Sequence, residues 1–317
     1  MSFSGKVKDE LSRYKAPARH CQIAEIAAII SLCGKVYISE SDKIRLNIQT
    51  ENIAVARKYF TLLKKSFNIN IDVSIRRNIL LKKSRTYKVA VNDDQAARRI
   101  LLATKLMNLH GEIEEDYSVI NHLIIQNTCC KRAFLRGFFL AAGSISDPRK
   151  AYHFEMICTG KEKAAQLQNI MAAFNIEAKI ILRKKYYVVY VKEGAQIVDI
   201  LNIMGAHMSL MDLENIRILK EMRNSINRRV NCETANISKT VSAAVKQVED
   251  ITYIKKAIGF GRLSEGLKEI ADLRLEYPEA SLSELGKLLS TPVGKSGVNH
   301  RLRKLSAIAD ELREQGT

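Results

Sequence analysis

Proline, glycine and long apolar runs are scarce in this sequence of 317 residues, which contains 4 prolines and 15 glycines. So little of either residue argues against long disordered linkers. No apolar stretch approaches the roughly 20 residues of a membrane-spanning helix, and the charged start of the chain, MSFSGKVKDELSRYK, lacks the apolar run of a signal peptide. We therefore expect a cytoplasmic protein of folded domains, with no membrane partner.

Metal-binding and disulfide patterns are also missing from the spacing of the six cysteines, which are Cys21, Cys33, Cys129, Cys130, Cys158 and Cys232. None of them forms a CxxC motif, and no pair of histidines lies nearby in the sequence. A chain of this length does not need a disulfide framework to fold. The spacing predicts buried or inert thiols, no metal site and no other cofactor.

Positive charge, by contrast, is abundant, because 51 lysines and arginines against 34 aspartates and glutamates give a formal net charge of +17. This excess favours an anionic partner, most often nucleic acid. A basic surface that is merely solvated explains the charge equally well, so composition leaves both interpretations open. Hydrophobic residues make up 46% of the chain, which is enough for two or three domains with buried cores.

A repeat of about one hundred residues organises the first two thirds of the chain. Each copy begins with an apolar helix that ends at a glycine, Gly34 or Gly143, and these glycines lie 109 residues apart. Alternating stretches that indicate hairpins, and amphipathic helices, follow in the same order in both copies. The pattern predicts an α+β (mixed α/β) fold with two αββαββα halves in one pseudo-symmetric domain. The alternative is that short αββ patterns recur by chance.

Small residues mark one face of the two apolar helices. Ala24, Ala28 and Ser31 lie on the first helix, and Gly137 and Ala141 lie on the second. Such residues let two helix backbones approach closely. We therefore expect the two helices to pack against each other at the seam between the repeats.

Beyond residue 210 the sequence becomes helical throughout. SLSELGKLLS begins with Ser281 and Glu284 at capping-box spacing. TPVG then interrupts the helical pattern, and KSGVNHRLRKLSAIADELRE resumes it with Ser296 as the expected cap. An apolar stripe at helical spacing should face the domain core, and it consists of Val298, Leu302, Leu305, Ala309 and Leu312. A short helix, a turn and a second helix predict a helix-turn-helix.

The second helix of this motif, residues 295–314, is the candidate for reading the major groove. Side chains of asparagine and arginine can pair there with adenine and guanine, and residues 295–304 hold four basic side chains and no acid. Base contacts are assigned to Ser296, Asn299, His300 and Arg303. Phosphate contacts are assigned to Lys295, Arg301 and Lys304. The alternative interpretation is a solvated basic helix.

Two helices that each end in small residues and a glycine resemble those of the LAGLIDADG homing endonucleases. In that family the residue before the final glycine is acidic, and the paired acids bind the metal ions that cleave DNA. Cys33 and Ala142 occupy those positions here, and the earlier acidic position falls on Ser31 and Leu140. Because Mg²⁺ requires carboxylates or similar oxygen ligands, we expect this fold without a catalytic site and without enzymatic activity.

Over its whole length the chain is identified as a member of the bacterial WhiA family of transcription regulators. The resemblance is carried by LRGFFLAAGSISDP, NIMGAH, EMRNSINRRVNCETANISKT and KSGVNHRLRKL. It implies a degenerate LAGLIDADG-like domain joined to a C-terminal helix-turn-helix domain. It also implies regulation of genes for cell division, chromosome segregation and, in some bacteria, sporulation. The implied partner is double-stranded DNA in the nucleoid, and RNA polymerase or another transcription factor is a further candidate.

The repeat and the resemblance together divide the chain into five parts. They are a lead-in at 1–20, a first LAGLIDADG-like repeat at 20–125, a second at 126–210, a connecting helix at 211–232 and the helix-turn-helix domain at 233–317.

Further basic residues are candidates for secondary DNA contacts. Homing endonucleases lay hairpins in the major groove, and the hairpins of this chain carry Arg76, Arg77, Lys82, Lys83, Arg183, Lys184 and Lys185. The connecting helix adds Arg223, Arg228 and Arg229, which either touch the DNA backbone or order the joint between domains. Hairpin ends that are merely solvated are the alternative.

Two other classes of function stay open from the sequence. One is a metal-dependent homing-type endonuclease, and the other is a protein scaffold that docks to the transcription machinery. Four histidines, His110, His122, His153 and His207, are scattered and have no paired nucleophile, so no catalytic triad is predicted among them.

Overall fold

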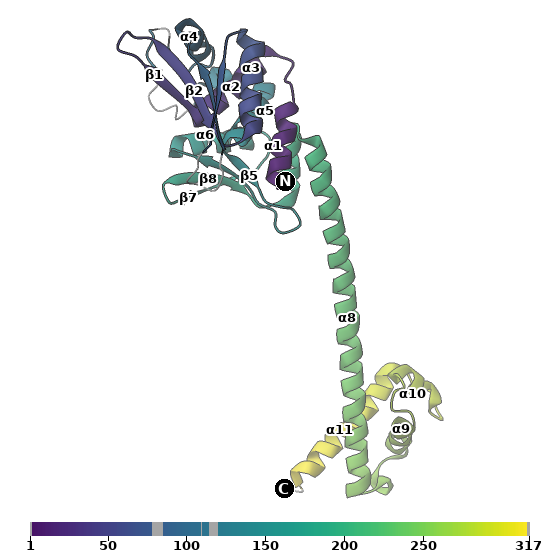
Figure 1. Ribbon diagram of the computed structural model, residues 1–317. Coiled ribbons are helices and arrows are strands. Elements are labelled where there is room, and N and C mark those ends of the chain that lie inside the picture. Colours follow the sequence, from purple (N-terminus) through teal and green to yellow (C-terminus); the bar gives the residue numbers. More distant parts are fainter. Residues whose placement is uncertain (1, 78–84, 109, 114–119, 316–317) are drawn as a thin grey trace. The chain divides into compact units, whose positions relative to one another are not determined.

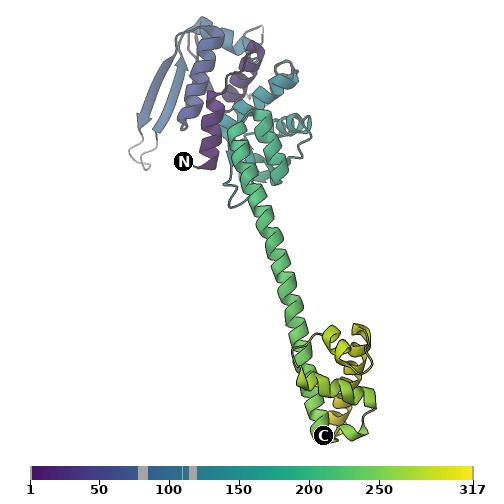
Figure 2. The same ribbon diagram turned by 90° about the vertical axis from the view of Figure 1, so that its right-hand side faces the viewer.

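The computed structural model describes residues 2–77, 85–108, 110–113 and 120–315, and it divides into two compact units, residues 1–220 and 221–317 (Figures 1 and 2). Within the described ranges, none of the helices combines the length and apolar character needed to cross a lipid bilayer.

The first repeat contains a four-stranded antiparallel sheet with three helices. Its strands lie in the order β1-β2-β4-β3. Its elements are α2 (Arg19–Cys33), β1 (Gly34–Ile38), β2 (Ile44–Thr50), α3 (Ile53–Phe67), β3 (Asp72–Arg77), β4 (Arg85–Val91) and α4 (Asp94–Ala103).

The second repeat has the same elements in the same order, with strands arranged as β5-β6-β8-β7. After a short 3₁₀ turn, η1 (His122–Ile125), its elements are α5 (Thr128–Ala142), β5 (Gly143–Ile145), β6 (Phe154–Cys158), α6 (Lys161–Ala172), β7 (Lys179–Arg183), β8 (Tyr186–Val191) and α7 (Gly194–Met204). The two sheets share one topology, so the predicted repeat is confirmed.

Each sheet buries one face and exposes the other. Ile44, Leu46 and Ile48 alternate along β2 and are buried, and Phe154 and Met156 do the same on β6. Because successive side chains on a strand point to opposite faces, the residues between them form the outer face of each sheet. These outer faces are the surfaces that a sheet of this fold can offer to a partner.

Helices α2 and α5 pack together at the seam between the repeats, and both sheets adjoin this pair (Figure 1). The small residues allow this packing. A Cβ at Gly137 would lie 2.6 Å from the carbonyl oxygen of Glu25 and 3.0 Å from Ala28 Cβ, distances that no side chain tolerates without backbone movement. The predicted helix seam is therefore confirmed.

A buried ion network also joins the repeats at this seam. The carboxylate of Glu25 on α2 is 0% exposed and lies 3.2 Å from Lys58 Nζ on α3 and 3.3 Å from Arg136 Nη1 on α5. Arg136 Nε also donates to the carbonyl of Met204 at 2.7 Å. Burial raises the pKa of the Glu25 carboxyl, and the two cations oppose this change. Removal of Glu25 would leave the two buried cations without an anionic partner.

The lead-in segment is an integral part of this unit. Residues Phe3–Arg13 form helix α1, which begins with Ser2 accepting a hydrogen bond from the Gly5 amide and buries Val7 and Leu11 in the common core. The carboxylate of Glu10 accepts hydrogen bonds from the backbone amides of Met208 and Ser209. In this way α1 also satisfies free amide groups at the start of α8 (His207–Ala257).

The second unit is wholly helical in its described residues. Helix α8 starts in the first unit and ends in the second, so the expected boundary at 232/233 falls inside a continuous helix of 51 residues. It is followed by η2 (Phe260–Arg262), α9 (Glu265–Glu276), α10 (Leu282–Leu288) and α11 (Lys295–Gln315). A separate apolar core combines Ile251 and Ile254 of α8 with residues of α9, α10 and α11.

Candidate nucleic-acid interface

Helix α10 begins at the capping box that the sequence predicts. The side chain of Ser281 accepts a hydrogen bond from the Glu284 amide, and the Glu284 carboxylate accepts one from the Ser281 amide at 2.8 Å. The hydrogen bond from the Ser281 backbone holds the pKa of Glu284 below its ordinary value. This reciprocal bonding satisfies two amides that would otherwise have no partner and fixes where α10 starts.

The turn between α10 and α11 depends on a glycine. Val293 donates its backbone amide to the Gly286 carbonyl at 3.0 Å. A Cβ at Gly286 would lie 2.2 Å from the carbonyl oxygen of Val293. Only glycine lets the chain fold back so closely on α10, and this close turn sets the start of α11.

One face of α11 is buried, as predicted. Val298, Leu302, Leu305 and Ala309 are at most 1% exposed, and Leu312 packs on the same core. The expected cap at Ser296 is wrong, because the helix already begins at Lys295 and the Val298 amide donates to the Gly294 carbonyl at 3.2 Å. Ser296 therefore lies in the first helical turn, where its side chain is exposed.

Most of the residues assigned to DNA contact lie on the opposite, solvent-facing side of α11. The exposed ones are Lys295, Ser296, His300, Arg303 and Lys304. They come from the first three turns of the helix, and among the described residues of 295–304 no carboxylate lies between them. This surface is basic, rich in donors and carried by a rigid, capped motif.

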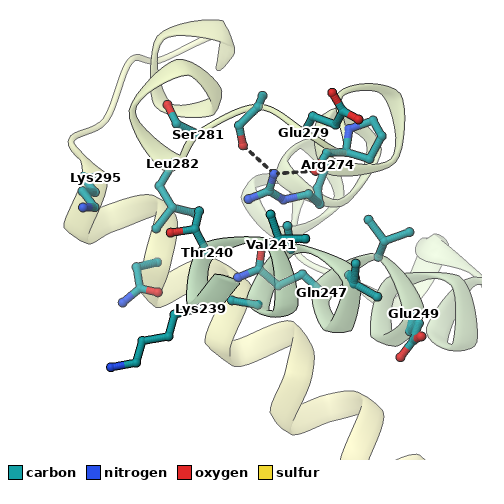
Figure 3. A pocket seen from close by; sticks show the side chains of 17 residues that line it. Lys239, Thr240, Val241, Gln247, Glu249, Arg274, Glu279, Ser281, Leu282 and Lys295 are labelled. Atoms are coloured by element: carbon teal, nitrogen blue, oxygen red, sulfur yellow. Dashed lines mark hydrogen bonds between the residues drawn. The ribbon is translucent and has the colours of Figure 1, made fainter. Parts of the chain in front are cut away.

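Asn299 and Arg301 lie differently from the other five. Asn299 is half-buried and, with Lys295, lines a groove of about 1010 Å³ between α8, the segment after α9 and the start of α11 (Figure 3). Arg301 is also half-buried, and its guanidinium lies against Gly266 at the start of α9, 3.5 Å from the Gly266 carbonyl oxygen. The side chain of Arg301 thus contributes to how α9 and α11 pack.

Arg274 is one of the residues that line this groove. The residue is 2% exposed, and its Nη1 donates to the carbonyls of Pro278 at 3.3 Å and Ala280 at 2.7 Å (Figure 3). Burial lowers the pKa of this guanidinium. The two hydrogen bonds hold the segment that leads from α9 into the capping box of α10.

The outer face of the first sheet is polar and basic. Lys35 on β1, Gln49 on β2, Arg76 on β3 and Lys88 on β4 share this face and line a small hollow of about 140 Å³ with Asn47. Arg76 pairs in register with Thr86, and Lys88 with both Gln49 and Ser74. The hairpin candidate Arg76 is thus part of a larger set of donors. This set was not grouped from the sequence, because the charge of the hairpin, Lys88 included, was weighed there rather than strand alternation.

The second hairpin is more neutral than its sequence indicates. Arg183 lies 3.5 Å from Glu155 on β6, and Glu155 also contacts His153 Nε2 at 3.1 Å. Lys184 occupies the turn with a φ of 56°, and the Lys185 ammonium lies 5.5 Å from the Tyr186 ring centroid. Arg183 therefore already has an anionic partner within the sheet.

The remaining secondary candidates have different positions. Arg223, Arg228 and Arg229 are exposed on α8 in the second unit. Arg77 is the last residue of β3. Lys82 and Lys83 lie outside the described residues.

Two lysines from other helices lie near the C-terminal ends of α2 and α5, the positions that the sequence resemblance aligns with the nuclease acids. Lys163 is 2% exposed and donates to the carbonyl of Ser31 at 2.8 Å. Lys8 lies beside Cys33, with its ammonium 5.7 Å from the Phe139 ring centroid. Burial lowers the pKa of Lys8 to about 8 and raises that of the Cys33 thiol. An ammonium, a thiol and a methyl group are not ligands for Mg²⁺.

Lys8 and Lys163 were not singled out from the sequence. Lys8 belongs to the lead-in helix and Lys163 to α6, so only the tertiary structure brings them to the ends of α2 and α5. No local spacing signals this approach.

Three family models match successive parts of this chain. The WhiA N-terminal LAGLIDADG-like domain matches residues 19–107, the WhiA LAGLIDADG-like domain matches 131–223, and the WhiA C-terminal HTH domain matches 226–309.

Full-length relatives and one solved structure are similar over nearly the whole chain. A protein from Lachnoclostridium phytofermentans named probable cell division protein WhiA is 59% identical over 99% of this chain and 100% of its own. One of the same name from Alkaliphilus metalliredigens is 46% identical over 100% of this chain and 99% of its own. The crystal structure of full-length WhiA from Thermatoga maritima is 26% identical, with a TM-score of 0.59 over 98% of this chain and 99% of that one.

Proposed function

Since this chain belongs to the WhiA family, we propose that it is a sequence-specific DNA-binding regulator of transcription. In this proposal α11 reads bases in the major groove. The regulated genes are those of cell division, chromosome segregation and, in some bacteria, sporulation. The protein then acts in the cytoplasm, at the nucleoid.

The observation that carries the proposal is the exposed basic half of α11 on a buried helix-turn-helix core. Arg303 and His300 extend from the solvent-facing side, while Val298 and Leu302 hold the helix from behind. A recognition helix needs both features, because its N-terminal half must enter the groove while the rest of the motif stays rigid.

Roles within the interface follow from exposure and chemistry. Arg303 donates in bidentate fashion to guanine, and Ser296 and His300 contact neighbouring base edges. Lys295 and Lys304 neutralise phosphates, which adds affinity at every sequence. Asn299 contacts a base from the rim of the groove beside Lys295. Arg301 adds a phosphate contact while its guanidinium rests on α9.

The former nuclease unit has a supporting role in this proposal. Its first sheet offers donors and positive charge to the DNA backbone, and the unit is also the candidate docking site for RNA polymerase or another transcription factor.

Because Ser31, Cys33, Leu140 and Ala142 replace the acids of the nuclease motif, we propose that the protein has no nuclease activity. Incubating plasmid DNA with the protein and Mg²⁺ or Mn²⁺ tests this, and site-specific nicking would contradict it.

The decisive experiment maps bound DNA across the genome with the full-length protein and then measures binding to the recovered sites. Arg303→Ala should weaken specific binding by about 1–3 kcal/mol and relax specificity at one position, whereas Lys304→Ala should weaken binding to all sequences. Glu311→Ala, an exposed change farther along the same helix, is the control. Unchanged specific binding in the double variant Arg303→Ala and Asn299→Ala would rule out α11 as the reading helix.

A further inference from the structure

Four side chains with nitrogen or sulfur ligand atoms meet at the N-terminal ends of the two seam helices. His20 and Cys21 lie in the first turn of α2, and Cys129 and Cys130 lie in the first turn of α5. Their ligand atoms all lie within 4.8 Å of one another, and Cys129 Sγ is 3.4 Å from His20 Nε2. The two adjacent pairs lie 109 residues apart in the sequence, and neither belongs to the nucleic-acid interface.

We propose that these four side chains bind one Zn²⁺ ion as a closed structural site. Three cysteines and one histidine are a common ligand set for tetrahedral structural zinc. With ordinary zinc–ligand bond lengths, such a site places its sulfurs about 3.8 Å apart and its sulfur and nitrogen about 3.5 Å apart. The 3.4 Å between Cys129 Sγ and His20 Nε2 matches the second value, and every other separation is at most 4.8 Å, about 1 Å more than the first value. Rotation of the exposed His20 and Cys129 side chains would close the difference.

The repeat itself places the four ligands. His20 and Cys129 are the second residues of α2 and α5, and Cys21 and Cys130 are the third. Each pair is separated by the same 109 residues that separate Gly34 from Gly143. The pseudo-twofold relation between the helices therefore gives two ligands from each repeat, which a search for CxxC spacing in one segment does not detect.

Electrostatics at this end of the helices favours the bound site. Zn²⁺ with three thiolates and a neutral imidazole carries a net charge of −1. The N-terminus of each helix carries roughly half a positive charge, and neither α2 nor α5 has a side chain that caps its first amides. The first-turn thiolates would therefore lie in a positive field from both helices. Coordination would release the three thiol protons to solvent.

Burial divides the ligands into an inner and an outer pair. Cys21 is 6% and Cys130 is 3% exposed, whereas His20 and Cys129 are open to solvent. An ion can therefore enter from the outer side and be held against the core. The site lies at the ends of α2 and α5 opposite to Cys33 and Ala142, so it is separate from the former nuclease centre, and it would tie the two repeats together.

Metal analysis of the full-length protein, purified under reducing conditions and treated with Zn²⁺, tests this proposal. We expect one equivalent of zinc to remain after gel filtration. Replacement by Co²⁺ should give the visible absorption of a tetrahedral site with thiolate charge transfer. The exposed changes His20→Ala and Cys129→Ser, and the buried changes Cys21→Ser and Cys130→Ser, should each lower the retained metal.

Cys232→Ser and Cys158→Ser are matched controls, because Cys232 is exposed and Cys158 is buried and both lie outside the group. Both should keep the full equivalent of zinc. Circular dichroism of the exposed variants, whose side chains contribute little to the core, separates loss of metal from loss of fold. Chelation of the ion should lower the thermal unfolding midpoint of the wild type and leave that of Cys129→Ser unchanged.

Three results would overturn the proposal. The first is a reduced wild type that takes up neither Zn²⁺ nor Co²⁺. The second is zinc that stays bound in the double variant His20→Ala and Cys129→Ser. The third is an intact mass two hydrogens lighter, with a Cys21–Cys130 disulfide in peptide maps of protein prepared without oxidant, because a disulfide would consume two ligands.

Discussion

The two sheets of the first unit have the same strand order and nearly the same register, yet their outer faces differ in chemistry. On the first sheet the outer face presents Lys35, Gln49, Arg76 and Lys88. On the second sheet the middle of the outer face is apolar, because Ile157 and Ile181 both pair there with Val188.

The acidic side chains on the two outer faces also differ in their partners. Glu155 on the outer face of the second sheet lies 3.5 Å from Arg183 and offsets its charge. On the first sheet Asp72, at the edge of the face, accepts a hydrogen bond from Asn92 at 2.6 Å. The first face therefore suits an anionic backbone, and the second suits it less. A duplicated fold can keep its core pattern while each copy's exposed positions change independently, because the exposed residues do not determine the packing.

The largest expected effect comes from breaking the seam that both sheets share. Glu25→Ala should destabilise the protein by about 3–5 kcal/mol, because it leaves Lys58 and Arg136 buried without their anionic partner. The free energy of unfolding from urea titration measures the loss. Glu51→Ala, at an exposed position, should change it little, and equal stability of the two variants would contradict the role assigned to the network.

Removing equal charge from the two outer faces compares them directly. The triple variant Lys35→Ala, Arg76→Ala and Lys88→Ala should weaken binding to all DNA sequences. The slope of log affinity against log salt should fall by about 1 for each phosphate contact removed.

The matched triple variant on the second sheet and its hairpin turn, Lys179→Ala, Arg183→Ala and Lys185→Ala, should leave that slope nearly unchanged. Fluorescence anisotropy across a salt series measures both triple variants. Equal slopes for the two would remove the distinction between the faces.

A half-buried cation, Lys8 of α1, lies beside Cys33 at the end of α2, where the nuclease motif has its first acid. Burial holds the pKa of Lys8 at about 8, below its value in the unfolded chain, so below pH 8 the folded state carries an unfavourable charge. The contribution of Lys8 to the free energy of unfolding should therefore rise between about pH 8 and pH 10.5, because there the unfolded state binds more protons at this group.

Lys8→Met should abolish that rise and stabilise the protein at pH 7 by about 1–3 kcal/mol. Urea titrations at three pH values measure both effects. A variant that is less stable than the wild type at pH 7 would show that the cation at the end of α2 stabilises the fold.

The smallest effect should come from the acid of the second sheet. Glu155→Gln removes the partner of Arg183 and should slightly increase affinity for DNA of any sequence, by less than about 1 kcal/mol, since partly exposed ion pairs contribute little. Asp147→Asn, an exposed change in the same repeat, is the control. A decrease in affinity would mean that Glu155 mainly holds Arg183 and His153 in place, rather than offsetting the positive charge of this face.

Features that depend on neighbouring residues were predictable from the sequence. The repeat, the capping box of Ser281 and Glu284, and the buried stripe from Val298 to Ala309 all rest on local periodicity or on contacts within one turn. The family also followed from continuous strings of residues. By itself the sequence thus determined the fold class and the exposed basic side of α11.

Only the tertiary structure decided which distant groups meet. The start of α11 at Lys295 rather than after a Ser296 cap depends on the close turn at Gly286. The inward positions of Asn299 and Arg301 depend on how α8, α9 and α11 pack. The approach of Lys8 and Lys163 to the seam, and the grouping of His20, Cys21, Cys129 and Cys130, depend on two helices paired across more than one hundred residues. Such contacts leave no trace in local spacing, because the distance between two side chains is set by the packing of whole elements.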